Sequence, residues 1–244
     1  MYDLEVFSKT DIGLIRRENQ DSSSYEVISS GCVWAVVCDG MGGVAGGKTA
    51  SSVAVEHITE TINKEYIEGM DTSSLSELMI KAVEESNTII FEKAAEDREL
   101  LGMGTTCELV FVRGSSVFVV HVGDSRTYSI RGGKILQLTE DHSVVQEMVR
   151  RGELTEAQAM RHPNKNVITR ALGVAPTVHI DYIEADFSYG DVILICSDGL
   201  SNFVSEAEIV KTVHENRGEM LIDTLVELAK KHGGADNITA TVIY

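Results

Sequence analysis

Positive charge is scarce in this chain. Its 244 residues include 21 Lys and Arg against 38 Asp and Glu, which gives a formal net charge of −17. This deficit disfavours nucleic acid as a partner, because phosphate backbones are bound through cations. Most of the acids are expected to form a solvated surface that aids solubility. The remainder should include any aspartates that are gathered to hold divalent metal ions.

Cysteine and long apolar runs are scarce as well. The four cysteines are Cys32, Cys38, Cys107 and Cys196. They stand in apolar runs without CxxC spacing, which predicts reduced core residues rather than a disulfide or a zinc site. No run approaches the roughly 18 apolar residues of a membrane helix, and acids interrupt the N-terminal apolar stretch, unlike a signal or transit peptide. We therefore expect a chain that makes no membrane contact and stays in the cytoplasm.

Linkers, repeats and low-complexity tracts are also lacking, so we expect one domain over residues 1–244. Apolar runs predict strands over residues 4–8, 32–38, 105–112, 117–122, 126–130, 135–138, 180–185, 192–196 and 238–244. Apolar spacing predicts helices over residues 48–66, 74–95, 206–214 and 219–232. Residues 140–170 are polar and are expected to form a short helix plus loop. The tight turns between the central strands require antiparallel pairing.

A possible nucleotide-binding loop lies in the first third of the chain. Residues 42–49 spell GGVAGGKT, which matches the G-x-x-x-x-G-K-[ST] loop of ATP- and GTP-binding proteins. Such a loop follows directly after a strand of a mostly parallel sheet. Here Asp-Gly-Met stands between the apolar run and the matched sequence, and the central strands are expected to be antiparallel. A nucleotide-hydrolysing enzyme is therefore only an alternative, with Lys48 and Thr49 better explained as a helix start. A catalytically inactive phosphoprotein-binding module is a second alternative.

Aspartates recur where apolar runs end. They are Asp21 in RRENQDS, Asp39 in VVCDGMGG, Asp124 in VGDSR, Asp198 in ILICSDGLS and Asp236, followed by Asn237, in GGADNIT. A single Asp-Gly usually marks a turn, but five such sites are difficult to explain as turns. Carboxylates at strand ends project from a rigid frame, and oxygen ligands without sulfur or imidazole suit magnesium or manganese.

The set R-x-x-N-Q-D, D-G-M-G-G, G-D-S-R, S-D-G-L and D-N, in this order between Gly13 and Asn237, resembles the metal-dependent protein phosphatase family. These are the PP2C-type serine/threonine phosphatases, and the likeness is greatest to their compact bacterial members. The resemblance implies an α+β fold, a four-layer α-β-β-α sandwich of two central antiparallel sheets flanked by helix pairs. It also implies hydrolysis of phosphoserine and phosphothreonine in proteins. We expect a monomer whose partners are a serine/threonine protein kinase and its phosphorylated substrates.

The resemblance also implies a metal centre at one end of the sandwich. Asp39 would bridge two Mn²⁺ or Mg²⁺ ions, and the carbonyl of Gly40 would complete the shell of one of them. Asp198 and Asp236 would hold the other ion, and Asp21 would bind metal-coordinated water. A water that bridges two such ions becomes hydroxide near neutral pH and can attack phosphorus in line.

Three further positions take roles from the resemblance. Asp124, together with Asp198, would hold a third and weaker ion. Arg16 would grip the substrate phosphate, since its planar fork can hold two phosphate oxygens. Its neighbour Arg17 is the less favoured candidate, and the sequence alone does not separate the two. Asn237 would support the site through hydrogen bonds.

Two residues depart from other members of the family. Gln20 stands where some members have Glu, and Met41 stands where animal members have a His proposed as general acid. Methionine cannot donate a proton, so the acid that protonates the leaving group stays unassigned. Residues 153–170 correspond to the variable flap beside the site. Its basic residues, which either contact phosphoproteins or form a solvated patch, are Arg161, His162 and Lys165.

Overall fold

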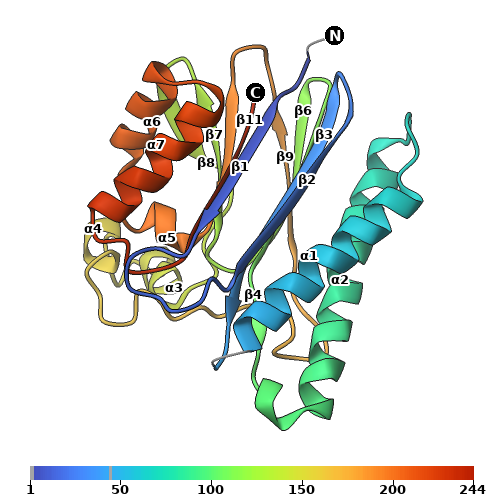
Figure 1. The fold of residues 1–244 in the computed structure, drawn as a ribbon, viewed down its shortest axis with the longest axis vertical. Coiled ribbons are helices and arrows are strands. Elements are labelled where there is room, and N and C mark those ends of the chain that lie inside the picture. Colours follow the sequence, from blue (N-terminus) through green and yellow to red (C-terminus); the bar gives the residue numbers. More distant parts are fainter. Residues whose placement is uncertain (1–2, 44–45) are drawn as a thin grey trace.

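Two antiparallel β-sheets lie face to face in the computed structural model, which describes residues 3–43 and 46–244 (Figure 1). One sheet has the order β1-β11-β10-β7-β8, and the other has the order β2-β3-β5-β6-β9, with β4 paired to the end of β3. Helices α1 and α2 cover the second sheet, and α6 and α7 cover the first. The predicted four-layer α-β-β-α sandwich is confirmed.

The strands are β1 Val6–Asp11, β2 Asp21–Ser29, β3 Cys32–Met41, β4 Gly104–Thr105, β5 Cys107–Arg113, β6 Ser116–Val122, β7 Arg126–Arg131, β8 Lys134–Gln137, β9 Asp181–Asp186, β10 Val192–Cys196 and β11 Ile238–Ile243. The α-helices are α1 Gly46–Glu65, α2 Thr72–Glu96, α3 Val144–Arg150, α4 Glu156–Ala159, α5 Asp198–Ser201, α6 Glu206–Glu215 and α7 Gly218–Lys231. A 3₁₀ turn, Arg98–Leu100, follows α2. No helix in the described ranges is long and apolar enough to cross a membrane.

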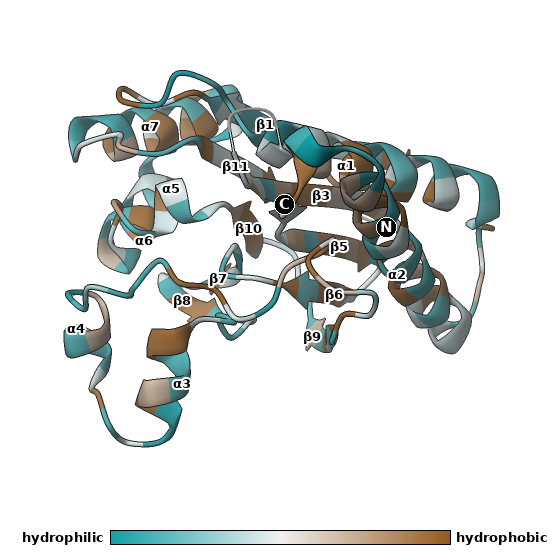
Figure 2. Cartoon of the chain, turned by 90° about the horizontal axis from the view of Figure 1, so that it is seen from below, coloured by the Kyte–Doolittle hydropathy of each residue, from teal (hydrophilic) through white to brown (hydrophobic). Residues whose placement is uncertain are grey.

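The core is divided into three layers by the two sheets. Along β3, Val33, Ala35 and Val37 point between the sheets, while Trp34 and Val36 point toward α1 and α2. This alternation follows from the period of two in a strand. Because both faces are covered, β3 is apolar throughout its first seven residues, and Figure 2 shows it as a hydrophobic strand inside amphipathic helices. All four cysteines are free and buried, as predicted.

One strand was missed in the sequence. β2 reads DSSSYEVIS and is mostly half-buried or exposed, because it lies at the edge of its sheet. Serine-rich edge strands lack the apolar run on which strand prediction depends, and β2 is defined instead by its long pairing with β3. The first strand also lies further along the chain than expected, at Val6–Asp11 rather than residues 4–8.

Element ends differ from expectation near the glycine-rich stretch. β3 continues through Asp39 to Met41, because Gly40 pairs with Thr105 of β4. Helix α1 begins at Gly46 rather than at Lys48. Asp39, expected as the last residue of its strand, therefore lies inside a paired strand that continues for two more residues, which fixes the direction of its backbone.

Candidate functional site

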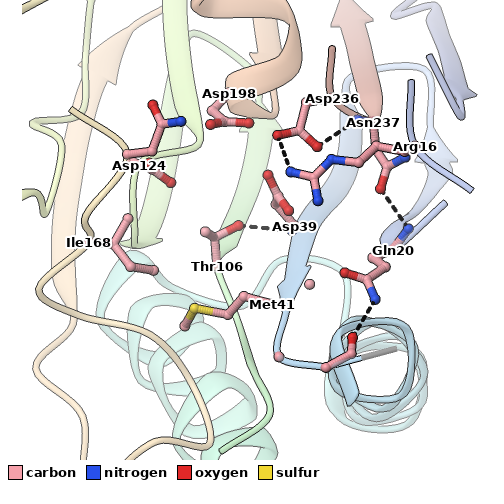
Figure 3. A pocket seen from close by; sticks show the side chains of 14 residues that line it. Arg16, Gln20, Asp39, Met41, Thr106, Asp124, Ile168, Asp198, Asp236 and Asn237 are labelled. Atoms are coloured by element: carbon pink, nitrogen blue, oxygen red, sulfur yellow. Dashed lines mark hydrogen bonds and ion pairs between the residues drawn. The ribbon is translucent and has the colours of Figure 1, made fainter. Parts of the chain in front are cut away.

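A pocket of about 310 Å³ opens at the end of the sandwich where β3 ends and α5 begins (Figure 3). Nine of the predicted site residues line it: Arg16, Gln20, Asp39, Gly40, Met41, Asp124, Asp198, Asp236 and Asn237. Asp21 does not line the pocket and is buried. Motifs that are spread over more than two hundred residues of sequence therefore meet in one pocket.

Each carboxylate reaches the pocket from a different element of the two sheets. Asp39 lies near the end of β3, and Asp124 lies in the turn between β6 and β7. Asp198 opens the one-turn helix α5 directly after β10, and Asp236 precedes β11. In Figure 3 these four side chains surround one space. Side chains carried on paired strands and short turns are held more rigidly than side chains on long loops.

Burial makes this group of acids difficult to ionise together. It raises the pKa of Asp198 to about 8, with the charges of Asp124 and Asp236 adding to the effect. It raises the pKa of Asp39 well above its usual range, again with the neighbouring carboxylates adding. Burial likewise raises the pKa of Asp21, and that of Asp124, to about 6. A cation would relieve both the desolvation and the mutual repulsion.

Two carboxylate oxygen atoms of these aspartates lack a hydrogen-bond partner in the described part of the chain. Oδ1 of Asp21 and Oδ1 of Asp198 are buried and accept no hydrogen bond from the described residues. Buried polar atoms are nearly always satisfied, so both oxygens suit a ligand. The donors are carboxylates and a backbone carbonyl, with no imidazole or thiolate lining the pocket. This donor set fits magnesium or manganese by its chemistry.

Asp21 and Asp236 are held by protein partners rather than arranged as ready ligands. Within residues 3–43 and 46–244, no three Asp, Glu, His or Cys side chains are grouped so that they would hold an ion. Asp236 accepts from Arg16 at 2.7 Å, and Asp21 accepts from Ser197 at 2.8 Å and Thr239 at 2.7 Å. Ion binding would therefore require side-chain rotation, at Asp236 above all.

Ser197 and Thr239 were not predicted from the sequence. Ser197 precedes α5 and Thr239 lies in β11, and the amide of Thr239 also donates to Oγ of Ser197 at 2.9 Å. Together they fix Oδ2 of Asp21 and leave Oδ1 unpartnered. Hydroxyls of this kind carry no sequence signal, because only the pairing of distant strands brings them to Asp21.

The loop that carries Arg16 is fastened to the residues before β11. Nδ2 of Asn237 donates to the carbonyls of Ile12 at 3.0 Å and Glu18 at 2.9 Å, while its Oδ1 accepts from the amide of Gln20 at 2.8 Å. The hydrogen bond from Arg16 to Asp236 raises the pKa of the guanidinium against a smaller opposing effect of burial. One amide side chain thus shapes the loop on both sides of Arg16.

Close backbone contact reinforces this loop. Gly13 has φ of 77°, and a Cβ there would lie 2.1 Å from the carbonyl oxygen of Asp236. Only glycine combines that backbone conformation with so close an approach. Arg17 is exposed, as Arg16 is, but it does not line the pocket.

Thr106 is a further site residue that the sequence did not reveal. Its Oγ1 accepts from the amide of Asp39 at 2.9 Å and shares a 2.8 Å hydrogen bond with Ser125. It therefore connects the end of β3 to the turn that carries Asp124. Threonine in an apolar strand run is ordinary, so no pattern in the sequence distinguishes it.

The described residues of the glycine-rich stretch do not have the surroundings of a phosphate-binding loop. Nζ of Lys48 donates to the backbone carbonyl of Asp21 at 2.9 Å and to Oγ of Ser22 at 3.1 Å, and so binds α1 to β2. The strand before it is antiparallel to both of its neighbours in the sheet. Val44 and Ala45, in the middle of the matched sequence, lie outside the described residues. The nucleotide-binding alternative receives no support from this geometry.

The flap, residues 153–170, contributes a wall of the pocket. It contains the short helix α4, and its Asn166 and Ile168 line the pocket, where Ile168 and Met41 lie on the same side in Figure 3. Lys165 lines an adjoining pocket of about 300 Å³ that also reaches Asp124 and Asp198. Arg161 and His162 line neither of these pockets. Of the three basic flap residues, Lys165 is the one that shares a described pocket with Asp124 and Asp198.

Comparison with known proteins gives the class to which this fold and site belong. The family model described as protein phosphatase 2C matches residues 16–231. A serine/threonine phosphatase, stp, of Listeria innocua is 36% identical over 236 residues, which cover 96% of this chain and 93% of that protein. The chain belongs to the protein phosphatase 2C family.

Solved structures agree with the family assignment. The serine/threonine phosphatase of S. agalactiae superposes with a TM-score of 0.92 at 35% identity and covers 99% of both chains. The catalytic domain of the serine/threonine protein phosphatase PstP, in complex with two manganese ions, superposes with a TM-score of 0.83 at 31% identity and covers 98% of this chain and 97% of that one. The family is metal-dependent, and the all-oxygen donor set described above is consistent with that dependence.

Proposed function

We propose that Asp39, Asp198 and Asp236, with the carbonyl of Gly40, hold two divalent cations with which this chain hydrolyses phosphoserine and phosphothreonine in proteins. The chain is a serine/threonine protein phosphatase of the PP2C type. The assignment of residues is supported above all by Asp39 and Asp198, whose pKa values are raised by burial, and by the unpartnered oxygen of Asp198. Buried acids without positive charge nearby would be costly, which favours a cation as the missing partner.

The protein groups prepare the reaction around these cations. Bound in the pocket, two divalent cations supply positive charge for the phosphate and lower the pKa of attacking water. Asp21 is held through Oδ2 by Ser197 and Thr239, so its unpartnered Oδ1 can accept a hydrogen bond from water in the centre. We propose that this contact orients the attacking water.

Arg16 is proposed to bind the substrate phosphate. Its side chain is half exposed and lines the pocket, and its guanidinium already stands beside Asp236. A planar fork can hold two phosphate oxygens and offset charge in the transition state.

Met41 lies in the pocket but has no proton to donate, so the leaving group must take its proton from elsewhere.

Two finer assignments follow from the same centre. Asp124 lies across the space from Asp236 and, together with Asp198, is proposed to hold a third, weaker cation. Phosphorylated proteins are the substrates of this class of enzyme, and we propose that a serine/threonine protein kinase supplies them.

The direct test is phosphate release from a phosphothreonine peptide in manganese, in magnesium and in excess chelator. Release with either metal, and none in chelator, is expected, and a matched phosphotyrosine peptide should be a much poorer substrate. Absence of release from folded protein in both metals would contradict the proposed function. Addition of ATP should leave the rate unchanged, because Lys48 is committed to the backbone of β2.

A further inference from the structure

A buried histidine connects the Asp124 turn to the flap, outside the residues that line the main pocket. The side chain of His142 is 6% exposed. Its backbone amide donates to the carbonyl of Gly123 at 2.7 Å, and its Nδ1 accepts from the amide of Gly123 at 3.1 Å. One residue therefore holds both backbone groups of the glycine that precedes Asp124.

The same histidine holds the base of the flap. We call residues 142–144 and 167–169 the stem, since they are paired through an antiparallel bridge at their centre. The carbonyl of His142 accepts from the amide of Thr169 at 2.7 Å. Ile168, in the adjoining strand of the stem, lines the main pocket. The position of that wall is consequently tied to the position of His142.

The outer edge of the imidazole is held by the second sheet. Nε2 lies 3.2 Å from Oδ2 of Asp181 in β9, and Arg170 donates to Oδ1 of the same carboxylate at 2.8 Å. Because the amide of Gly123 donates to Nδ1, the hydrogen of the neutral ring is on Nε2, which faces Oδ2 of Asp181 and also lies 3.0 Å from Nη1 of Arg170, a residue of the flap. Burial and the neighbouring His121 lower the pKa of His142 to about 4, which agrees with a neutral ring.

A buried polar network lies behind this residue. The ring of His121 is 4.3 Å from that of His142, centroid to centroid. His121 is hydrogen-bonded through Nδ1 to Glu108 and through Nε2 to the carbonyl of Glu140 at 2.9 Å. Glu108 also accepts from Thr127 of the opposite sheet at 2.7 Å. The imidazole thus packs on a network that joins the two sheets, so it has little freedom to shift alone.

We propose that His142 is a positioning residue that fixes the Asp124 turn and the flap wall relative to each other. Cation binding at Asp124 and contact between the flap and a phosphoprotein are then coupled through the side chain and backbone of this one residue. The inference rests on the proposed function for the role of Asp124. The arrangement of the turn and the stem can be measured without metal or substrate.

The test compares three variants. His142→Ala removes the ring, whereas His142→Asn keeps an acceptor near the place of Nδ1 but does not reach Asp181. The matched control is His57→Asn, because Nε2 of His57 also lies 3.2 Å from an acid, Glu85, but on the helical layer. Amide hydrogen exchange is followed residue by residue by NMR on the metal-free chain.

In His142→Ala, the amide of Gly123 should exchange roughly tenfold faster, the effect of about one lost hydrogen bond. The amide of Thr169 keeps its acceptor, the backbone carbonyl of residue 142, and should exchange several-fold faster because the stem loses the support of the ring. In His142→Asn, Gly123 should stay within about twofold of the parent rate, while Thr169 should still exchange faster. His57→Asn should change neither amide. If His142→Ala fails to fold, His142→Asn still tests the proposal, because in that variant the Thr169 amide should exchange faster while the Gly123 amide should not.

Activity provides a second readout. In His142→Ala the manganese concentration for half-maximal phosphate release and the KM for a phosphopeptide should both rise several-fold, with a smaller change in kcat. In His142→Asn, which keeps the hydrogen bond to Gly123, the KM should rise and the manganese concentration should change little. Loss of folded protein alone would lower kcat and leave the other two values unchanged. Unchanged exchange at both amides in His142→Ala would overturn the proposal. Lack of phosphate release by the parent chain would overturn the proposed function instead, and the exchange measurement would still judge the positioning role.

Discussion

Nη2 of Arg16 lies 2.7 Å from Oδ2 of Asp236. The residue proposed to bind the substrate phosphate therefore contacts a carboxylate proposed to bind a cation. Phosphate held by Arg16 would lie directly beside the metal end of the sandwich, which is where an attacking water must meet it. When metal ions bind, Asp236 must therefore give up its hydrogen bond to the Arg16 guanidinium and coordinate a metal ion instead.

Replacing Arg16 by alanine should reduce kcat/KM for a phosphopeptide about 10- to 100-fold, mainly through KM. The estimate reflects the loss of one or two charge-assisted hydrogen bonds to phosphate. Arg17→Ala is the matched control and should stay within about twofold, because Arg17 is exposed and outside the pocket. A loss of activity in Arg17→Ala with none in Arg16→Ala would reverse the assignment.

Asn237→Ala should destabilise the protein by about 2–4 kcal/mol, because it removes three hydrogen bonds worth about 0.5–1.5 kcal/mol each. The loop that carries Arg16 would lose these hydrogen bonds to residue 237, so kcat/KM should fall as well. Asn216→Ala removes a single bond to the carbonyl of Thr212 and should cost about 1 kcal/mol or less without loss of activity. Urea unfolding with phosphate release measures both effects, and equal destabilisation of the two variants would count against the loop-fastening role.

Gly13→Ala should displace the Arg16 loop and lower kcat/KM at least tenfold. The added Cβ would lie 2.1 Å from a backbone oxygen of Asp236, so the backbone itself must move. Gly69→Ala is a matched control, since Gly69 also has positive φ, 85°, but no atom lies within 4 Å of its Cβ position. It should cost about 1 kcal/mol of stability and leave kinetics unchanged. Normal kinetics in Gly13→Ala would show that the close contact is not needed.

The metal-free protein should lose stability as the pH rises from 5 to 8.5. Asp21 and Asp198 have pKa values of about 6 and 8 in the folded chain, above the value of about 3.9 expected for an unfolded Asp. Between these values the folded state holds more protons than the unfolded state, so raising the pH favours unfolding. The unfolding free energy in chelator should fall by a few kcal/mol, since each pKa unit corresponds to about 1.4 kcal/mol.

Asp198→Asn should reduce this loss, because the amide cannot ionise, and it should be more stable than the parent at pH 8.5 without metal. Asp223→Asn, an exposed acid paired with Lys9, serves as control and should keep the full pH dependence. Manganese should restore the stability of the parent at pH 8.5, because it binds the folded state. A stability that rises with pH in chelator would contradict this account of the buried acids.

The sequence predicts the strands that are buried on both faces much better than those at the edge. β3 and β10 were found from their apolar runs, and each run leads directly to a site carboxylate, Asp39 or Asp198. β2 was missed because its serines give no apolar period, although its first residue is Asp21. Its place in the sheet follows from pairing with β3, which no local pattern contains.

Residues that hold the site together are hidden in the sequence for the same reason. Thr106, Ser197 and Thr239 act through hydrogen bonds between segments far apart in the chain. His142 is one of seven histidines without paired-ligand spacing, so only the folded arrangement reveals its contacts. The roles of the aspartates themselves were expected from the family resemblance, and they stay predictions until tested by substitution.

The most direct test of the central claim is to measure manganese binding by equilibrium dialysis and phosphate release on the same samples of the parent chain and Asp39→Asn. The proposed centre predicts at least two ions per parent chain, the loss of tight binding in Asp39→Asn, and a fall in phosphate release of a thousandfold or so. Asp223→Asn should match the parent in both. Parent-like binding and release in folded Asp39→Asn would show that the carboxylate at the end of β3 does not hold the catalytic ions.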